Sequence, residues 1–175
     1  AQPTRHRRCP TMNASLLQSS AEKHLPAALD FLRRLVAINS FTSNSEGVDE
    51  VARLTAAAFA PLGFEAELAP CVTSGTGHHL FLTHRGQGGE PIVLVTHSDT
   101  VFPPEEERLN DFKWDERPDE GRIYGPGTVD NKGGTALIWL ILQSLQDAAP
   151  DVFERTHWLV AANAAEEIIG DDFGR

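Results

Sequence analysis

Two continuous apolar segments constrain the fold of this chain most strongly. Residues Ile92 to Val95 and residues Trp158 to Ala162 contain no charged or polar side chain. A strand with one face in water alternates apolar and polar residues, whereas an unbroken run of this kind is typical of a strand that is covered on both faces. We therefore predict two buried strands in a layered sheet, the first of them central.

The segments around these runs alternate between helical and strand patterns. Apolar side chains at helical spacing predict three helices, at residues 24–39, 48–62 and 133–146, and Gly63 is suited to end the second helix. Strand patterns add two further strands, at residues 64–69 and 78–85. Residues 102–132 read as a long polar loop. This order predicts an α/β fold, a layered domain with a mixed, mainly parallel sheet flanked by helices.

Composition narrows the classes of partner. The 175 residues carry a formal net charge of -10, which argues against nucleic acid or an anionic membrane as partner. Cys9 and Cys71 are too few for a disulfide framework. No apolar run approaches the roughly 18 residues of a membrane span. The basic start lacks the apolar segment of a signal peptide, which favours a cytoplasmic location.

Residues 1–11 are predicted to be an extension ahead of a domain that starts at Met12 and runs over residues 12–175.

Three short motifs contain the candidate metal-binding and catalytic side chains. They are "THSDT" (96–100), "GPGTVDNKGG" (125–134) and "AAEE" (164–167). The first and third follow the two apolar strands, and the second leads into the apolar helix. In open α/β sheets, ligands bind in the crevice beyond the carboxyl ends of the strands. We therefore expect all three motifs to meet at one edge of the sheet.

The side chains of these motifs indicate a divalent metal. They are one imidazole, His97, and four carboxylates, Asp99, Asp130, Glu166 and Glu167. Four converging carboxylates without compensation would repel one another, and one or two divalent cations would resolve the conflict. Zinc accepts imidazole and carboxylate together, so the mixture is more zinc-like than calcium-like.

Each residue of this set has an expected task. Asp99, two residues after His97, is placed to accept the other N–H of the imidazole. Asp130 lies beside glycines and could bridge two ions. Glu166 and Glu167 point in different directions, so one can bind metal while the other acts as a base.

Each motif alone is weak, and only the combination favours a metal site. A His–x–Asp sequence at a strand end is most often a surface pair, and adjacent glutamates are mostly solvated. The glycine-rich motif is not a P-loop, because Lys132 is not followed by Ser or Thr. Lys132 is assigned to a local ion pair. The remaining nearby polar groups are assigned to surface, turn or solvated loop: His78, His79, His84 and residues 105–108.

The segments that contain these motifs resemble those of a known family. The segments "VTHSDTVFP", "GRIYGPGTVDNKGG" and "NAAEEIIG" are similar to the di-zinc metallopeptidase family that contains glutamate carboxypeptidase, acetylornithine deacetylase, succinyl-diaminopimelate desuccinylase and the aminoacylases. The "YGPG" is most similar to the glutamate carboxypeptidase branch. The resemblance implies the following roles: His97 ligates one zinc, Asp130 bridges both, Glu167 ligates the other, Asp99 supports His97, and Glu166 is the general base. It also implies a cis peptide at Asp130–Asn131.

The sequence also departs from that family. Many members have a second aspartate where this chain has Asn131. The family takes a further carboxylate ligand from just downstream of the glutamate pair and a histidine ligand from near its C-terminus, with a lid or dimerisation domain between them. We give Asp171 and Asp172 little weight as substitutes. We therefore expect residues 12–175 to form the N-terminal part of the catalytic domain without the lid, to be nearly inactive alone, and to dimerise only through the missing lid.

The expected function is zinc-dependent hydrolysis of an amide bond. The substrate would be a small N-acyl amino acid or dipeptide, as for a carboxypeptidase, with cobalt or manganese as alternative metals. Glu166 would take a proton from water and pass it to the leaving amine. Two alternatives stay open. One is deacylation of the acetylornithine or diaminopimelate type, and the other is a non-catalytic module that binds a metal or small ligand.

Overall fold

The computed structural model describes residues 13–73, 75–87 and 89–168, and the predicted extension at residues 1–11, Cys9, Asp171 and Asp172 lie outside them. The helices are α1 (Ala14–Val36), α2 (Ser45–Phe59), α3 (Pro104–Leu109), α4 (Lys132–Ala148) and α5 (Pro150–Arg155), with 3₁₀ turns at Ala60–Leu62 and Pro118–Glu120. The strands are β1 (Glu65–Pro70), β2 (His78–His84), β3 (Ile92–His97), β4 (Asp115–Arg117), β5 (Arg122–Tyr124) and β6 (Trp158–Asn163). Gly63 ends the second helical segment in the left-handed conformation, as predicted.

The main sheet has the strand order β1-β2-β6-β3. β3 pairs with β6 in parallel, whereas β1 with β2 and β2 with β6 are antiparallel. The prediction of a mixed α/β sheet is confirmed, but the parallel majority is wrong for the described residues. A short connection joins β1 to β2 and permits only antiparallel pairing, while the crossover through α4 makes β3 and β6 parallel.

The two apolar runs occupy different places in this sheet. β6 lies between β2 and β3 and is largely buried, as predicted. The prediction that residues 92–95 form a central strand is wrong for the described chain, because β3 is one of the two edge strands. The side chains of Ile92, Val93 and Val95 are 47%, 48% and 62% exposed. Apolar composition indicates which strands are suited to burial, but it does not determine their order across the sheet.

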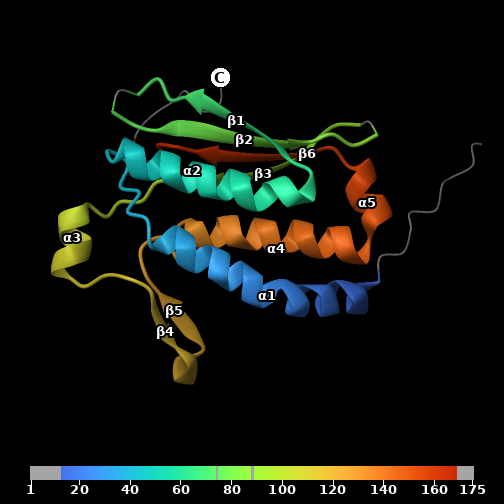
Figure 1. The fold of residues 1–175 in the computed structure, drawn as a ribbon, viewed down its shortest axis with the longest axis horizontal. Helices are drawn as coiled ribbons and strands as arrows, with labels where there is room; N and C mark the ends of the chain where they lie inside the picture. The colour runs from blue at the N-terminus through green and yellow to red at the C-terminus, as the bar shows by residue number, and fades with distance from the viewer. Residues whose placement is uncertain (1–12, 74, 88, 169–175) are drawn as a thin grey trace, which may run out of the picture.

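The helices lie on one side of the main sheet (Figure 1). α2 and α4 are next to the strands, and α1 packs against α4 beyond them (Figure 1). The buried cluster joins these layers, with Phe31 and Leu35 from α1, Phe59 from α2, Leu82 from β2 and Leu142 from α4. No described helix is both long and apolar enough to cross a bilayer.

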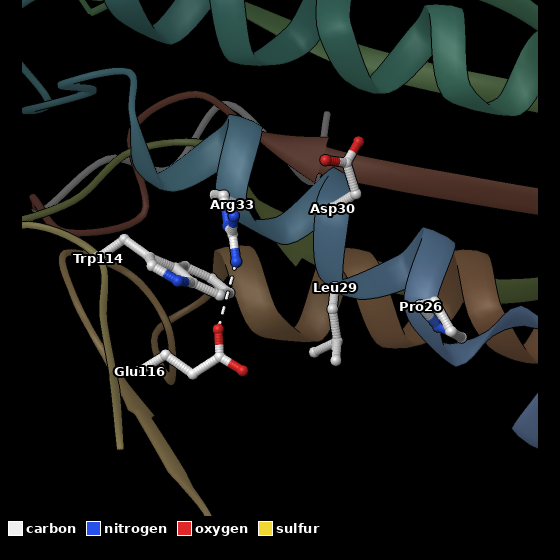
Figure 2. Close-up of a pocket in the computed structure, with 6 residues that line it drawn as sticks. All are labelled: Pro26, Leu29, Asp30, Arg33, Trp114 and Glu116. Carbon is white, nitrogen blue, oxygen red and sulfur yellow. Dashed lines mark hydrogen bonds and ion pairs between the residues drawn. The ribbon is translucent and has the colours of Figure 1, made fainter. Parts of the chain in front are cut away.

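The segment predicted as one polar loop contains α3 and a β4–β5 hairpin. α3 includes residues 105–108, of which Glu105, Glu106 and Arg108 are exposed, as predicted, whereas Glu107 is partly buried. The hairpin region is held against α1 by Arg33, whose guanidinium lies 5.1 Å from the centre of the Trp114 ring and 3.2 Å from Glu116 (Figure 2). Cation–π and ionic contacts of this kind need few apolar residues, so the loop shows little periodicity in its sequence.

Candidate metal centre

The carboxyl ends of β3 and β6 meet at one edge of the sheet. Their parallel register places His97 opposite Asn163, so the segment that carries His97 and Asp99 continues beside the one that carries the glutamates. Asp130 comes to the same edge from the loop ahead of α4. Ligand atoms of His97, Asp130 and Glu167 all lie within 4.8 Å of one another, the one such group found among the described residues.

His97 is buried between carboxylates. Its Nε2 lies 2.8 Å from Asp130 Oδ1, and its Nδ1 lies 3.1 Å from the Asp99 carbonyl oxygen and 3.3 Å from Asp99 Oδ1. Glu166 Oε2 is 4.0 Å from Nε2. Burial lowers the pKa of the imidazole, but the hydrogen bonds and charges of Asp99, Asp130 and Glu166 outweigh it and raise the pKa to about 9. In the metal-free protein the imidazole is therefore protonated at neutral pH.

Asp99 organises the site from a fully buried position. Its Oδ2 accepts the hydroxyl of Thr42 at 2.7 Å and the N–H of Glu167 at 3.2 Å, while Oδ1 accepts the N–H of Glu166 at 3.1 Å. Burial raises the pKa of this carboxyl, but its bonds to His97, Thr42 and the two amides lower the pKa overall. Asp99 thus holds both the imidazole and the backbone of the glutamate pair.

The four backbone N–H groups of residues 164–167 all donate to side chains. The four acceptors are His79 Nδ1 for Ala164, Asn163 Oδ1 for Ala165, and the two carboxylate oxygens of Asp99 for Glu166 and Glu167. Short polar contacts of this kind fix a segment that has no regular secondary structure.

The surface or turn assignment of the histidines on β2 is wrong for two of them. His79 and His84 are buried, whereas His78 is partly exposed and lies 3.0 Å from Asp49. His84 shares the inward face with Leu80 and Leu82, so period-2 alternation could have predicted its burial. The contact of His79 with Ala164 spans 85 positions, and no local pattern indicates it.

Lys132 supports the loop that carries Asp130. It is buried and donates to the carbonyl oxygen of Ile38 at 2.7 Å, which replaces the local ion pair predicted for it. Burial lowers the pKa of its ammonium to about 8, partly offset by the charge of Glu107. A Cβ on Gly127, which has a φ of +76°, would lie 2.9 Å from the Lys132 side chain, so this position requires glycine.

Asp130 itself has a mostly exposed side chain, at 73%. Its peptide bond to Asn131 is cis, as the family resemblance implies. Thus all five predicted site residues come together: His97 and Asp99 are buried, and the carboxylates of Asp130, Glu166 and Glu167 reach the surface or lie near it.

The donor set fits a divalent cation. Burial raises the pKa of Glu167, and the charges of Asp130, Asp99 and Glu166 raise it further while that of His97 lowers it. The carboxylates therefore repel one another, and the proton on His97 compensates only one charge. One imidazole with two carboxylates is a ligand set that zinc accepts.

Comparisons with known proteins identify a similar family and similar individual proteins. Residues 93–174 match the family described as Peptidase family M20/M25/M40. Carboxypeptidase G2 of Pseudomonas sp. (strain RS-16) is 29% identical over 133 residues, which are 76% of this chain and 31% of that protein. The segment 93–174 contains the predicted ligands His97, Asp130 and Glu167 and the predicted general base Glu166.

Solved structures share the fold. The dipeptidase Dug1p from Saccharomyces cerevisiae matches with a TM-score of 0.68 at 13% identity, over 87% of this chain and 35% of that chain. Human carnosine dipeptidase 1 matches with a TM-score of 0.62 at 17% identity, over 90% of this chain and 36% of that chain. The chain therefore spans about a third of the length of these relatives. The resemblance predicted from the motifs is supported: residues 93–174 match the model of Peptidase family M20/M25/M40, and the fold is similar to that of two dipeptidases.

Proposed function

We propose that these 175 residues supply a zinc-binding part of a hydrolase that cleaves an amide bond in a small N-acyl amino acid or peptide. The observation that carries this proposal is the convergence of ligand atoms from His97, Asp130 and Glu167 within 4.8 Å. The match to Peptidase family M20/M25/M40 over the same residues supports it independently.

The metal would be held by His97, Asp130 and Glu167, with zinc preferred and cobalt or manganese as substitutes. When bound, the ion supplies Lewis-acid chemistry, which polarises an amide carbonyl and lowers the pKa of a water molecule. Asp99 would keep His97 oriented, because its carboxylate faces Nδ1 and leaves Nε2 directed at Asp130. For the metal to bind, His97 must release the proton that the neighbouring carboxylates stabilise.

Glu166 would act as the general base. Its carboxylate is 54% exposed and lies beside the proposed ligands, while Asp99 holds its backbone N–H. It would take a proton from the attacking water as oxygen bonds to the carbonyl carbon. It would then deliver that proton to the nitrogen as the carbon–nitrogen bond breaks, so that the amine leaves neutral.

The substrate class rests on the relatives. Their names describe a carboxypeptidase and two dipeptidases, all of which act on peptides. We propose a small peptide or N-acyl amino acid for this chain as well. The cytoplasmic location and dimerisation through a lid domain remain predictions from the sequence.

Zinc titration of three matched proteins tests the proposal. The wild type and Glu166→Gln should bind zinc with similar affinity, because Glu166 is not a proposed ligand, whereas His97→Ala should lose at least about a factor of 100 in affinity. The exposed Asp119→Asn serves as control for a lost surface charge. Hydrolysis of N-acetyl amino acids, dipeptides and peptides with C-terminal glutamate is then measured at high protein concentration, with and without chelator.

The outcomes separate the candidate functions. Turnover that disappears with chelator and in Glu166→Gln supports the hydrolase. Zinc binding without turnover fits both the near inactivity expected of these residues alone and the non-catalytic alternative, so turnover is the result that discriminates between them. Equal zinc affinity in the wild type and His97→Ala would contradict the site itself.

A further inference from the structure

His79 is buried at the end of the sheet from which the glutamates emerge. β2 and β6 are antiparallel, so the first residues of β2 lie beside the last residues of β6. There, His79 Nδ1 accepts the backbone N–H of Ala164 at 3.1 Å. Acceptance at Nδ1 requires a neutral ring with its proton on Nε2. Ala164 follows the last residue of β6, so this hydrogen bond continues the connection between the two chain segments after the regular ladder has ended.

Ala164 is the first residue after β6 and lies three positions before Glu167. Its N–H is the first of the four that fix residues 164–167, and the acceptors of the last two belong to Asp99. The path of the chain from β6 to the glutamates is thus held at its start by His79 and at its end by Asp99. Loss of the first acceptor would leave a buried N–H unpaired, which favours a shift of the segment.

We propose that His79 is a positioning residue for the metal centre: by accepting the Ala164 N–H, it sets the direction in which the chain leaves β6 and so brings Glu167 to His97 and Asp130. This inference rests on the proposed function, because its consequence is read at the metal site. His79 acts through the backbone and is not itself one of the three proposed ligands.

Three substitutions of His79, which keep, move or remove the hydrogen-bond acceptor, test this role. In His79→Asn, Oδ1 is the same number of bonds from Cβ as Nδ1 and can accept the same N–H. In His79→Gln, the oxygen reaches one bond further, and His79→Leu has no acceptor. We expect His79→Asn to keep zinc affinity within about threefold of wild type. His79→Leu and His79→Gln should weaken it about tenfold or more, the range typical of residues that support metal ligands.

His84 provides the matched control. It is the other buried histidine of β2, and its ring lies 4.7 Å from Phe153 and 5.6 Å from Phe64, centroid to centroid. Asparagine at this position should lower the melting temperature through lost packing but leave zinc affinity unchanged. Affinities are compared by competition with a chelator under conditions where circular dichroism shows every variant folded.

Amide exchange at Ala164, measured with chelator present, reads the hydrogen bond without the metal. The N–H should be protected in the wild type and His79→Asn and exchange faster in His79→Leu. Wild-type zinc affinity in folded His79→Leu, or equal losses in His79→Asn and His79→Leu, would overturn the inference. If His79→Leu does not fold, equal affinities of the Asn and Gln variants overturn it instead.

The two proposals can fail separately. If the wild type binds no zinc, the proposed function is overturned. In that case, protection of Ala164 that survives in His79→Asn and is lost in His79→Leu still supports the hydrogen bond through which His79 acts.

Discussion

The candidate site has two halves with opposite physical character. Asp99 and His97 are buried, and the carboxylate of Asp99 accepts hydrogen bonds from the Thr42 hydroxyl and from the amides of Glu166 and Glu167. Asp130 and Glu166 have side chains that are 73% and 54% exposed. Glu167 belongs to the same half, and burial and the charges of the neighbouring carboxylates raise its pKa. The buried half is therefore expected to contribute to the stability of the fold, whereas the exposed half is suited to bind a cation that comes from solvent. Substitutions in the two halves should separate stability from metal affinity.

The largest effect on stability is expected for Asp99→Ala. The change leaves the Thr42 hydroxyl and the amides of Glu166 and Glu167 without their acceptor, and it removes the buried carboxylate that faces the imidazolium of His97. Removal of one partner from a buried ionic network costs about 3–5 kcal/mol in the free energy of unfolding. Urea denaturation measures this cost. Asp147→Ala, which removes an exposed partner of Lys23 and His24, should cost less than about 1 kcal/mol. Equal costs for the two variants would contradict a structural role for the buried half of the site.

The protonation of His97 predicts a pH dependence of the metal-free protein. Its pKa in the folded state is about 9, above the ordinary 6.5, so the folded state binds this proton more tightly than the unfolded state. The stabilisation is fully present below pH 6.5 and is lost as pH rises through about 9. Its size is on the order of 3 kcal/mol. Urea denaturation in chelator at a series of pH values measures it, and His97→Gln should lack this component. Because the pKa of Lys132, about 8, also lies in this range, the test is the difference in stability between the wild type and His97→Gln. A difference that stays constant from pH 6.5 to 9.5 would show that the carboxylates do not hold the proton.

A smaller effect is expected for Thr42→Val, which removes one hydrogen bond to Asp99. A hydrogen bond to a charged group contributes about 1.5–3 kcal/mol, so the free energy of unfolding should fall by about 2 kcal/mol. Thr55→Val is the matched control, because the Thr55 hydroxyl is buried without a hydrogen-bond partner. That control should be neutral or stabilising. If both variants lose the same stability, the hydroxyl of Thr42 has no special part in holding Asp99.

The smallest effect is expected for Glu167→Gln in chelator. Burial and neighbouring carboxylates raise the pKa of Glu167, so its charge is disfavoured in the folded protein. Removal of that charge should change the free energy of unfolding by less than about 0.5 kcal/mol, or raise it slightly. A loss comparable to that of Asp99→Ala would place Glu167 in the buried half.

The sequence indicated the proposed ligands of the candidate site better than the residues that hold those ligands in place. His97 is the last residue of β3, Glu167 follows β6 and Asp130 precedes α4, so the order of strands and helices was enough to predict that they meet at one edge. The contacts of Thr42, His79 and Lys132 span 57, 85 and 94 positions, and no short motif encodes them. For the fold, periodicity predicted three helices and four strands. It did not predict that β3 is an edge strand, because strand order depends on how the chain crosses the sheet.

The measurement that tests the metal centre most directly is calorimetric titration of zinc into the wild type, Asp130→Asn and Glu167→Gln, with Asp119→Asn as control. The site described here predicts that the wild type and the control bind alike. Each ligand variant should bind at least about tenfold more weakly while staying folded. Zinc affinity that is the same in all four proteins, or absent from the wild type, would contradict the assignment of His97, Asp130 and Glu167 as a metal site.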